Sequence, residues 1–181
     1  MAREADTIRV WDPFVRLCHW ALVAAFAAAW VTAEETMRLH ELLGYAVVAL
    51  VGARLAWGAV GPRHARFESF VPGARTVAGY LKDVVRGRAR RYVGHNPAGA
   101  AMILALIAGL LTVAGTGWAM TVPGFGGEAL EEVHEVAASL MLVLVAGHVL
   151  GVVASSLAHK ENLVLAMLTG RKRKAETGDV A

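Results

Sequence analysis

Apolar residues gather in four long segments, at residues 17–33, 40–60, 97–122 and 133–158. Each approaches or exceeds the roughly 20 residues that a helix needs to cross about 30 Å of hydrocarbon. There is no ten-residue alternating pattern typical of a membrane barrel, and backbone polar groups in lipid must be satisfied internally. The pattern therefore predicts an all-α fold, a four-helix transmembrane bundle formed as one domain over residues 1–181.

The stretch between the second and third segments carries a shorter pattern. Val77, Leu81 and Val84 recur at helical spacing with charged residues between them. This spacing predicts an amphipathic helix that lies on the inner membrane surface or docks a partner. The basic tail, residues 159–181, contains Arg171 to Lys174, and these residues and the polar ones beyond are expected to form a solvated end.

Composition and charge extend this picture. Hydrophobic residues make up 56% of the chain and the mean hydropathy is +0.49, as expected for a membrane protein. Residues 61–96 and the tail are rich in Lys and Arg, whereas the two short connections carry several Glu residues and the single Arg38. The positive-inside rule predicts cytoplasmic termini and a cytoplasmic long loop. This topology explains the arginines without a nucleic-acid partner, and the first span is expected to remain in the mature protein.

Four histidines sort by depth in the predicted bundle. His134 and His148 are fourteen residues apart, so on one helix both lie on the same side, about 21 Å apart along the axis. His40 begins the second span and His134 the fourth, both on the outer side, while His19 and His148 fall in the inner half. The predicted pairs are His40 with His134 and His19 with His148.

Two imidazoles from facing helices are what a six-coordinate haem iron requires. The chain has one cysteine, Cys18, and no Cys-x-x-Cys-His sequence, which excludes covalent attachment. The histidines therefore predict two haem b groups, with ordinary packing as the alternative for any single histidine. Zinc is an alternative because Glu41 and Glu135 each place a carboxylate next to a histidine. It is a weaker one, since adjacent side chains on a helix point about 100° apart and do not chelate one ion well.

Three arginines are candidates for binding haem propionates. Arg54 follows His40 by fourteen residues, at the predicted depth of His148, so an inner haem propionate is a natural partner. Its alternative is a side chain that extends to the cytoplasmic surface. Arg16 is a second candidate at the inner haem, and Arg38 is a candidate at the outer one.

Several segments resemble a known family. They are VWDPFVRLCHW at 10–20, HNPAGA at 95–100, His134-Glu135 with His148, and HKENL at 159–163. Together they resemble the prokaryotic b561-type cytochromes, and are most similar to the cytochrome b subunit of nickel-iron hydrogenases. The resemblance implies a di-haem inner-membrane protein that passes electrons between a periplasmic partner and the quinone pool. His19, His40, His134 and His148 match its ligand positions.

The partner and the exact activity stay open at this stage. The short connection between the third and fourth spans fits a c-type cytochrome as well as a hydrogenase. An electron-transfer subunit is favoured over a self-contained quinone-linked oxidoreductase, such as a superoxide oxidase, and over a histidine-dependent metal or proton transporter. His95 and His159 are candidates for a quinone or proton site, with solvated surface histidines as the simpler interpretation. The sequence is also compatible with a homo-oligomer.

Overall fold

The computed structural model describes residues 6–180, which divide into two compact units. We call the first the terminal unit: it comprises the chain up to Arg16, residues Trp57–Leu104, and the chain from Gly147 onward. The second, the helical unit, comprises Leu17–Ala56 and Ala105–Ala146.

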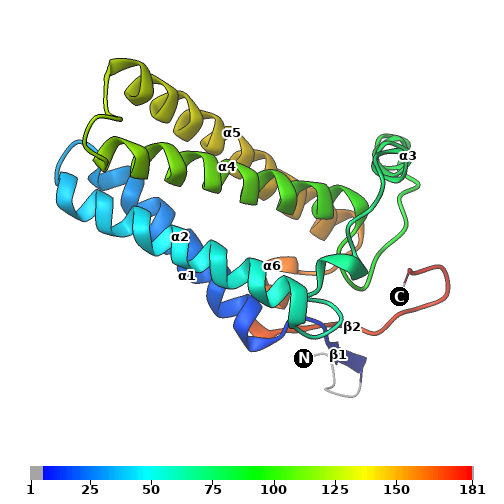
Figure 1. Ribbon diagram of the computed structural model, residues 1–181. Coiled ribbons are helices and arrows are strands. Elements are labelled where there is room, and N and C mark those ends of the chain that lie inside the picture. Colours follow the sequence, from blue (N-terminus) through cyan, green and yellow to red (C-terminus); the bar gives the residue numbers. More distant parts are fainter. Residues whose placement is uncertain (1–5, 181) are drawn as a thin grey trace. The chain divides into compact units, whose positions relative to one another are not determined.

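The four apolar segments form four long helices. They are α1 (Pro13–Thr32), α2 (Met37–Val60), α4 (Pro97–Thr121) and α5 (Glu128–Ala158) (Figure 1). Each is long and apolar enough to cross a membrane. At most 17% of the residues in the most apolar window of any span are buried within the protein, so lipid has to cover most of their apolar side chains. The predicted all-α transmembrane bundle is confirmed.

Helix α5 begins earlier than the hydrophobic pattern predicts, at residue 128 instead of 133. Its first turn carries Glu128 and Glu131. Carboxylates there interact favourably with the positive end of the helix dipole, so a segment that looks like a polar loop extends the helix.

In the helical unit, all four spans contribute to one small apolar core. Its fully buried members are Ala25 from α1, Val47 and Val51 from α2, Leu110 from α4 and Met141 from α5. Close helix packing at α4 depends on a glycine, because a Cβ at position 109 would lie 2.8 Å from the sulfur of Met141. The core thus joins the four helices within this unit.

Two spans begin with the same N-terminal motif, a capping side chain followed by a proline. Asp12 accepts hydrogen bonds from two amides of the first turn of α1, at 2.9 and 3.1 Å, and Pro13 follows it. Asn96 accepts one from the amide of Gly99 at 2.7 Å, ahead of Pro97 in α4. Proline fits the first helical position because its missing N–H needs no partner there. Both pairs lie within the segments that carry the family resemblance.

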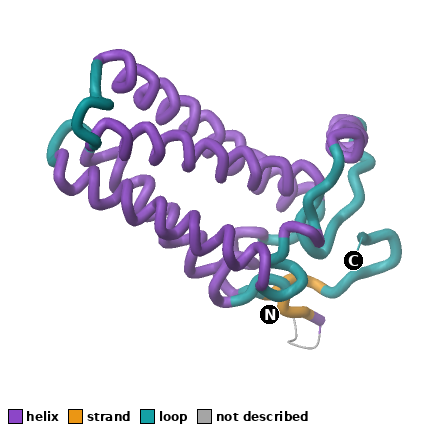
Figure 2. The backbone as a smooth tube through the Cα atoms, in the orientation of Figure 1, coloured by secondary structure: helices purple, strands orange, loops and turns teal. Residues whose placement is uncertain are grey.

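The terminal unit also holds shorter elements: the 3-10 helix η2 (Phe67–Ser69), α3 (Ala74–Val85) and α6 (Leu163–Thr169) (Figure 2). Helix α3 confirms the predicted amphipathic helix. Tyr80 on α3 is buried, whereas Leu81 and Val84 remain about half exposed and Val85 is almost fully exposed. An apolar stripe left uncovered in a membrane-spanning chain suits the membrane surface.

The prediction of a solvated C-terminal tail is wrong for its first residues. Strand β1 (Thr7–Arg9) pairs antiparallel with β2 (Arg171–Arg173), and Lys172 is only 5% exposed. Between α6 and β2, Gly170 adopts a left-handed conformation (φ 79°) and its carbonyl accepts the amides of residues 10 and 11. The two ends of the described chain are therefore tied together by backbone hydrogen bonds.

A buried ionic network holds the tail in place. The Arg91 guanidinium binds both carboxylate oxygens of Glu161, at 2.7 and 3.2 Å, and also the carboxylate of Asp179. Lys172 lies 3.4 Å from Glu161 and donates to the carbonyl of Tyr92 at 3.0 Å. A run of basic residues looks solvated in the sequence because its partners are distant in the chain.

The network sets the charge states of its members. Burial would raise the pKa of Glu161, but the hydrogen bond from Arg91 and the charge of Lys172 outweigh burial and hold that pKa below its usual range. Burial lowers the pKa of Lys172, and Glu161 opposes that shift. Because folding lowers the carboxyl pKa of Glu161, its ion pairs add stability above the ordinary carboxyl range, and this stability is lost as the pH falls through the lowered value.

We expect Arg91→Ala to release the tail, because it leaves Glu161 buried without its guanidinium, a loss of about 3 kcal/mol. Hydrogen exchange of the β2 amides should accelerate by about a hundredfold. Arg88→Ala is the matched control, since Arg88 is exposed. Unchanged exchange in Arg91→Ala would mean that strand pairing alone holds the tail. In the wild-type protein, the same amides should lose protection as the pH falls below the ordinary carboxyl range, because the lowered pKa of Glu161 lies there.

Candidate functional site

Two predicted ligands, His40 and His134, face each other in the helical unit. His40 lies on α2 and His134 on α5, and both are half-buried. Their ring centroids are 6.1 Å apart and the ring planes are nearly perpendicular, at 85°. The structure thus brings together the outer pair expected from depth alone.

One hydrogen bond shows that Nδ1 of His40 carries a proton. Its Nδ1 lies 2.8 Å from the carbonyl oxygen of Ala29, which can only accept, so this nitrogen carries the proton. Ala29 belongs to the last four residues of α1, whose carbonyls have no further turn of helix to bond. His40 therefore satisfies a helix end and keeps the lone pair of Nε2 available.

The same protonation follows for His134. Its Nδ1 lies 3.0 Å from Oγ1 of Thr116 on α4. The Thr116 hydroxyl also lies 2.9 Å from two carbonyls of its own helix, those of Thr112 and Val113, to which it can only donate. The hydroxyl oxygen is then the acceptor toward His134, whose Nδ1 carries the proton and whose Nε2 is a free ligand atom.

This arrangement fits an iron held between two imidazoles. Two metal–nitrogen bonds of about 2 Å on opposite sides of one metal ion place the ring centroids about 6 Å apart, as observed here. Metal-binding histidines characteristically donate their other ring N–H to a carbonyl or hydroxyl. Both histidines meet this condition.

Two glycines leave space around the histidine pair. A Cβ at Gly117 would lie 3.1 Å from Cε1 of His134, so the ring occupies the room that this glycine leaves. A Cβ at Gly44 would meet nothing within 4 Å, and Gly44 lies one turn after His40 on the same side of α2. The open space beside His40 suits a flat ligand such as a porphyrin.

The other two candidate ligands belong to different units. His19 lies on α1 in the helical unit, and His148 lies on α5 in the terminal unit; both are half-buried. Their pairing stays a prediction.

The three candidate arginines differ in their surroundings. Arg54, in the helical unit, is 8% exposed, so its side chain is enclosed by protein instead of extending to a surface. Arg16 donates to the carbonyl of Leu168 at the end of α6. Arg38 is exposed, two residues before His40.

The candidate quinone residues both lie in the terminal unit. The His95 ring is between two aromatic rings, with centroid distances of 4.5 Å to Trp11 and 4.2 Å to Phe70. Burial lowers the pKa of His159, and the charge of Arg91 lowers it further although nearby carboxylates oppose this. His159 is therefore neutral at neutral pH and able to accept a proton.

Sequence reasoning missed Thr116 and the carbonyl of Ala29. Thr116 lies near the end of α4 that leads into the connection before α5, so the depth comparison applied to the histidines would also have selected it. Nothing in the residue type of Ala29 marks its carbonyl as a partner, because that role comes from where α1 ends.

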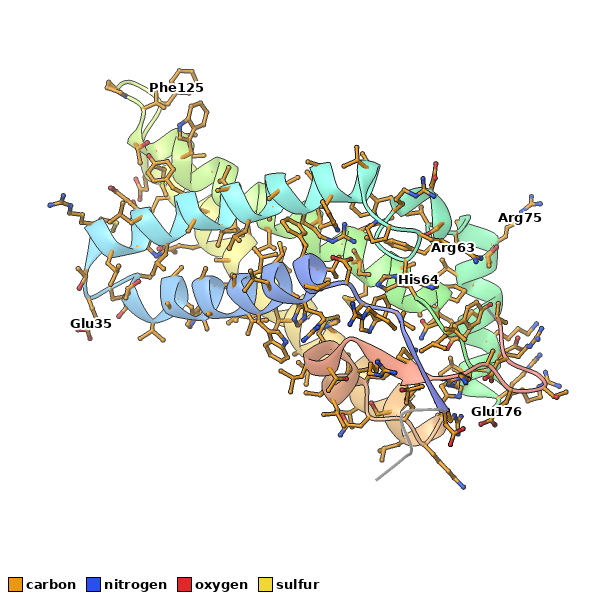
Figure 3. All side chains as sticks on the ribbon, turned by 90° about the horizontal axis from the view of Figure 1, so that it is seen from below. Glu35, Arg63, His64, Arg75, Phe125 and Glu176 are labelled. Carbon is orange, nitrogen blue, oxygen red and sulfur yellow. The ribbon has the colours of Figure 1, made fainter. Side chains whose placement is uncertain are left out.

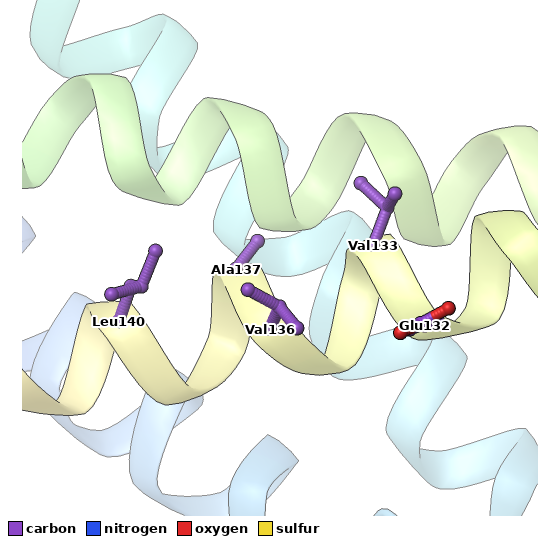
Figure 4. A pocket seen from close by; sticks show the side chains of 5 residues that line it. All are labelled: Glu132, Val133, Val136, Ala137 and Leu140. Atoms are coloured by element: carbon purple, nitrogen blue, oxygen red, sulfur yellow. The ribbon is translucent and has the colours of Figure 1, made fainter.

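A shallow hollow of about 340 Å³ lies on α5, lined by Glu132, Val133, Val136, Ala137 and Leu140 (Figure 4). All five come from one helix and none of them is a histidine. Within residues 6–180 there is also no group of three or more His, Cys, Asp or Glu side chains arranged to hold a metal ion. The facing histidines are therefore the candidate site.

A bundle of membrane-spanning helices that holds facing imidazoles is typical of the membrane cytochromes with b-type haem. The family model of prokaryotic cytochrome b561 matches residues 10–170, and the chain belongs to that family. A search of curated proteins finds no match. The protein is thus a membrane-spanning b-type cytochrome that takes part in electron transfer.

Replacing Gly117 by valine should displace the His134 ring, because a branched side chain would occupy the ring's place. We expect Gly117→Val to lower the haem bound per chain, measured as the pyridine haemochrome of the purified protein. Gly115→Val is the matched control on the same helix, since a Cβ at Gly115 meets nothing within 4 Å. Equal haem content in the two variants would show that the ring does not need this space.

Proposed function

We propose that this chain is a di-haem cytochrome b that carries electrons across the bacterial inner membrane, between a periplasmic redox partner and the quinone pool. The observation that carries the proposal is the His40–His134 pair, with ring centroids 6.1 Å apart and both Nδ1 atoms hydrogen-bonded. His40 and His134 would ligate the outer haem iron, and His19 and His148 the inner one.

When bound, each haem supplies a one-electron change at its iron. The protein's part is to hold the ligands and to limit water. The carbonyl of Ala29 and the hydroxyl of Thr116 keep both outer imidazoles in one tautomer and one orientation. Arg54 is a buried cation that suits the propionates of the inner haem.

The proposed orientation places both termini and the long loop in the cytoplasm. Strand pairing between β1 and β2 supports a common side for the two termini, and Val93 of the long loop donates its amide to the carbonyl of Val180. The acidic connections, at Glu35 and around Phe125, carry exposed side chains (Figure 3) and would face the periplasm. A periplasmic partner, either a hydrogenase or a c-type cytochrome, would meet the outer haem there.

A quinone would react in the terminal unit, near His95 and His159. Quinol oxidation releases protons together with electrons, so it needs a proton acceptor. A neutral His159 is suited to that role, since the pKa of its ring lies below the ordinary value. His95, whose ring contacts those of Trp11 and Phe70, is the second candidate for contact with the quinone.

Haem stoichiometry in histidine variants tests the proposal. The wild-type protein should bind two haems, and His40→Ala, His134→Ala, His19→Ala and His148→Ala should each bind one. The double variant His40→Ala/His134→Ala should keep one haem, whereas His40→Ala/His148→Ala should lose both. His64→Ala, in the terminal unit, is the control and should keep two. Reduced-minus-oxidised absorbance of detergent-purified protein measures each case, and a wild-type protein without haem would favour the transporter hypothesis.

The quinone step is tested by stopped-flow haem reduction with a short-chain quinol. His95→Gln/His159→Gln should slow reduction by quinol and leave reduction by dithionite unchanged, because only the quinol must give up protons. His64→Gln is the control. Quinol reduction at the wild-type rate in the double variant would remove these residues from the proposal.

A further inference from the structure

A cavity of about 720 Å³ lies in the terminal unit, against α6 and β2. Its lining includes five basic side chains, those of Lys160, Arg171, Lys172, Arg173 and Lys174. Such a volume falls in the range of small-molecule sites, and the excess of positive charge favours an anion.

Three acidic residues also line the cavity, Asp6, Glu161 and Glu176, and the last two form ion pairs. Glu161 binds Lys172 at 3.4 Å as well as Arg91, and Glu176, on the exposed tail (Figure 3), lies 3.3 Å from Arg173. Lys160 makes no ion pair or side-chain hydrogen bond within residues 6–180. Its ammonium is therefore a cation at the cavity whose charge no described carboxylate neutralises.

The backbone at Lys160 supplies an independent observation. Lys160 has a positive φ of 50°, the left-handed conformation that usually selects glycine after a helix. It follows the end of α5, where the amide of Glu161 donates to the carbonyl of Ser156 at 3.1 Å. A long cationic side chain thus stands where the backbone favours glycine, which points to a use for that side chain.

The cavity also has an apolar border. Lys160 is two residues beyond the end of the membrane-spanning α5, at the level where lipid headgroups lie. Helix α6 follows at once, and its Val164, Leu165 and Leu168 are about half exposed. Leu165 itself lines the cavity, so cationic and apolar surfaces meet there.

We propose that this cavity binds the phosphate of an anionic phospholipid, with Lys160 as a principal contact and the lipid's acyl chains against the exposed residues of α6. An acidic lipid matches both parts of this surface, because its phosphate can bind the basic side chains and its acyl chains can cover the apolar ones. A soluble anion matches only the basic part.

The test is thermal unfolding of the haem-loaded protein in nonionic detergent, titrated with dihexanoyl phosphatidylglycerol, dihexanoyl phosphatidylcholine or inorganic phosphate. We expect saturable stabilisation by phosphatidylglycerol. Lys160→Gly should raise its half-saturating concentration about fivefold, the effect of removing one cation near a lipid headgroup. Without lipid, this variant should be at least as stable as wild type, because glycine suits the left-handed backbone.

Lys160→Arg should retain the response, and Arg88→Gln controls for general loss of positive charge. Identical half-saturation in Lys160→Gly and wild type would overturn the proposal, and so would equal stabilisation by phosphatidylcholine. Stabilisation by inorganic phosphate equal to that by phosphatidylglycerol would assign the cavity to a soluble anion and overturn the lipid assignment.

Discussion

The hydrogen bonds made by Nδ1 of His40 and His134 are the interaction on which the candidate haem site depends. A buried imidazole N–H that is left without a partner costs about 1–3 kcal/mol. The carbonyl of Ala29 and the hydroxyl of Thr116 avoid this cost. The same bonds place the proton of each ring on the side away from Nε2, so that helix packing, before any metal is bound, prepares both ligand atoms.

The orientation of the two imidazoles depends on where α1 ends and on a glycine in α4. Ala29 is an available acceptor because α1 ends three residues later, at Thr32. His134 has its position because Gly117 contributes no side chain to the space of its ring. The candidate ligands, His40 and His134, thus take their geometry from contacts with α1 and α4, two helices that carry neither of them.

The elements of the fold could be predicted from the sequence because lipid imposes a simple rule on it. Long apolar segments must be helices, so α1, α2, α4 and α5 follow from hydropathy, and α3 follows from its periodicity. The depth argument predicts that His40 and His134 form a pair, and their rings do lie 6.1 Å apart. It could not identify Thr116 or Ala29 as partners, since those contacts depend on helix rotation and on exact helix ends. The prediction of a solvated tail failed at Lys172, because Glu161 and Arg91 become its neighbours only when the chain folds.

The outer histidine pair and the tail network satisfy their polar groups by different physical means. In the helical unit, neutral N–H groups bond to neutral oxygens, an arrangement that carboxylate protonation and salt leave unchanged. In the terminal unit, Arg91, Glu161 and Lys172 are held as charged partners, which acid weakens by protonating the carboxylate. If the proposed haem binds there, the hydrogen bonds of the two histidines can hold one ligand geometry when the iron changes charge, because neither of them is an ion pair.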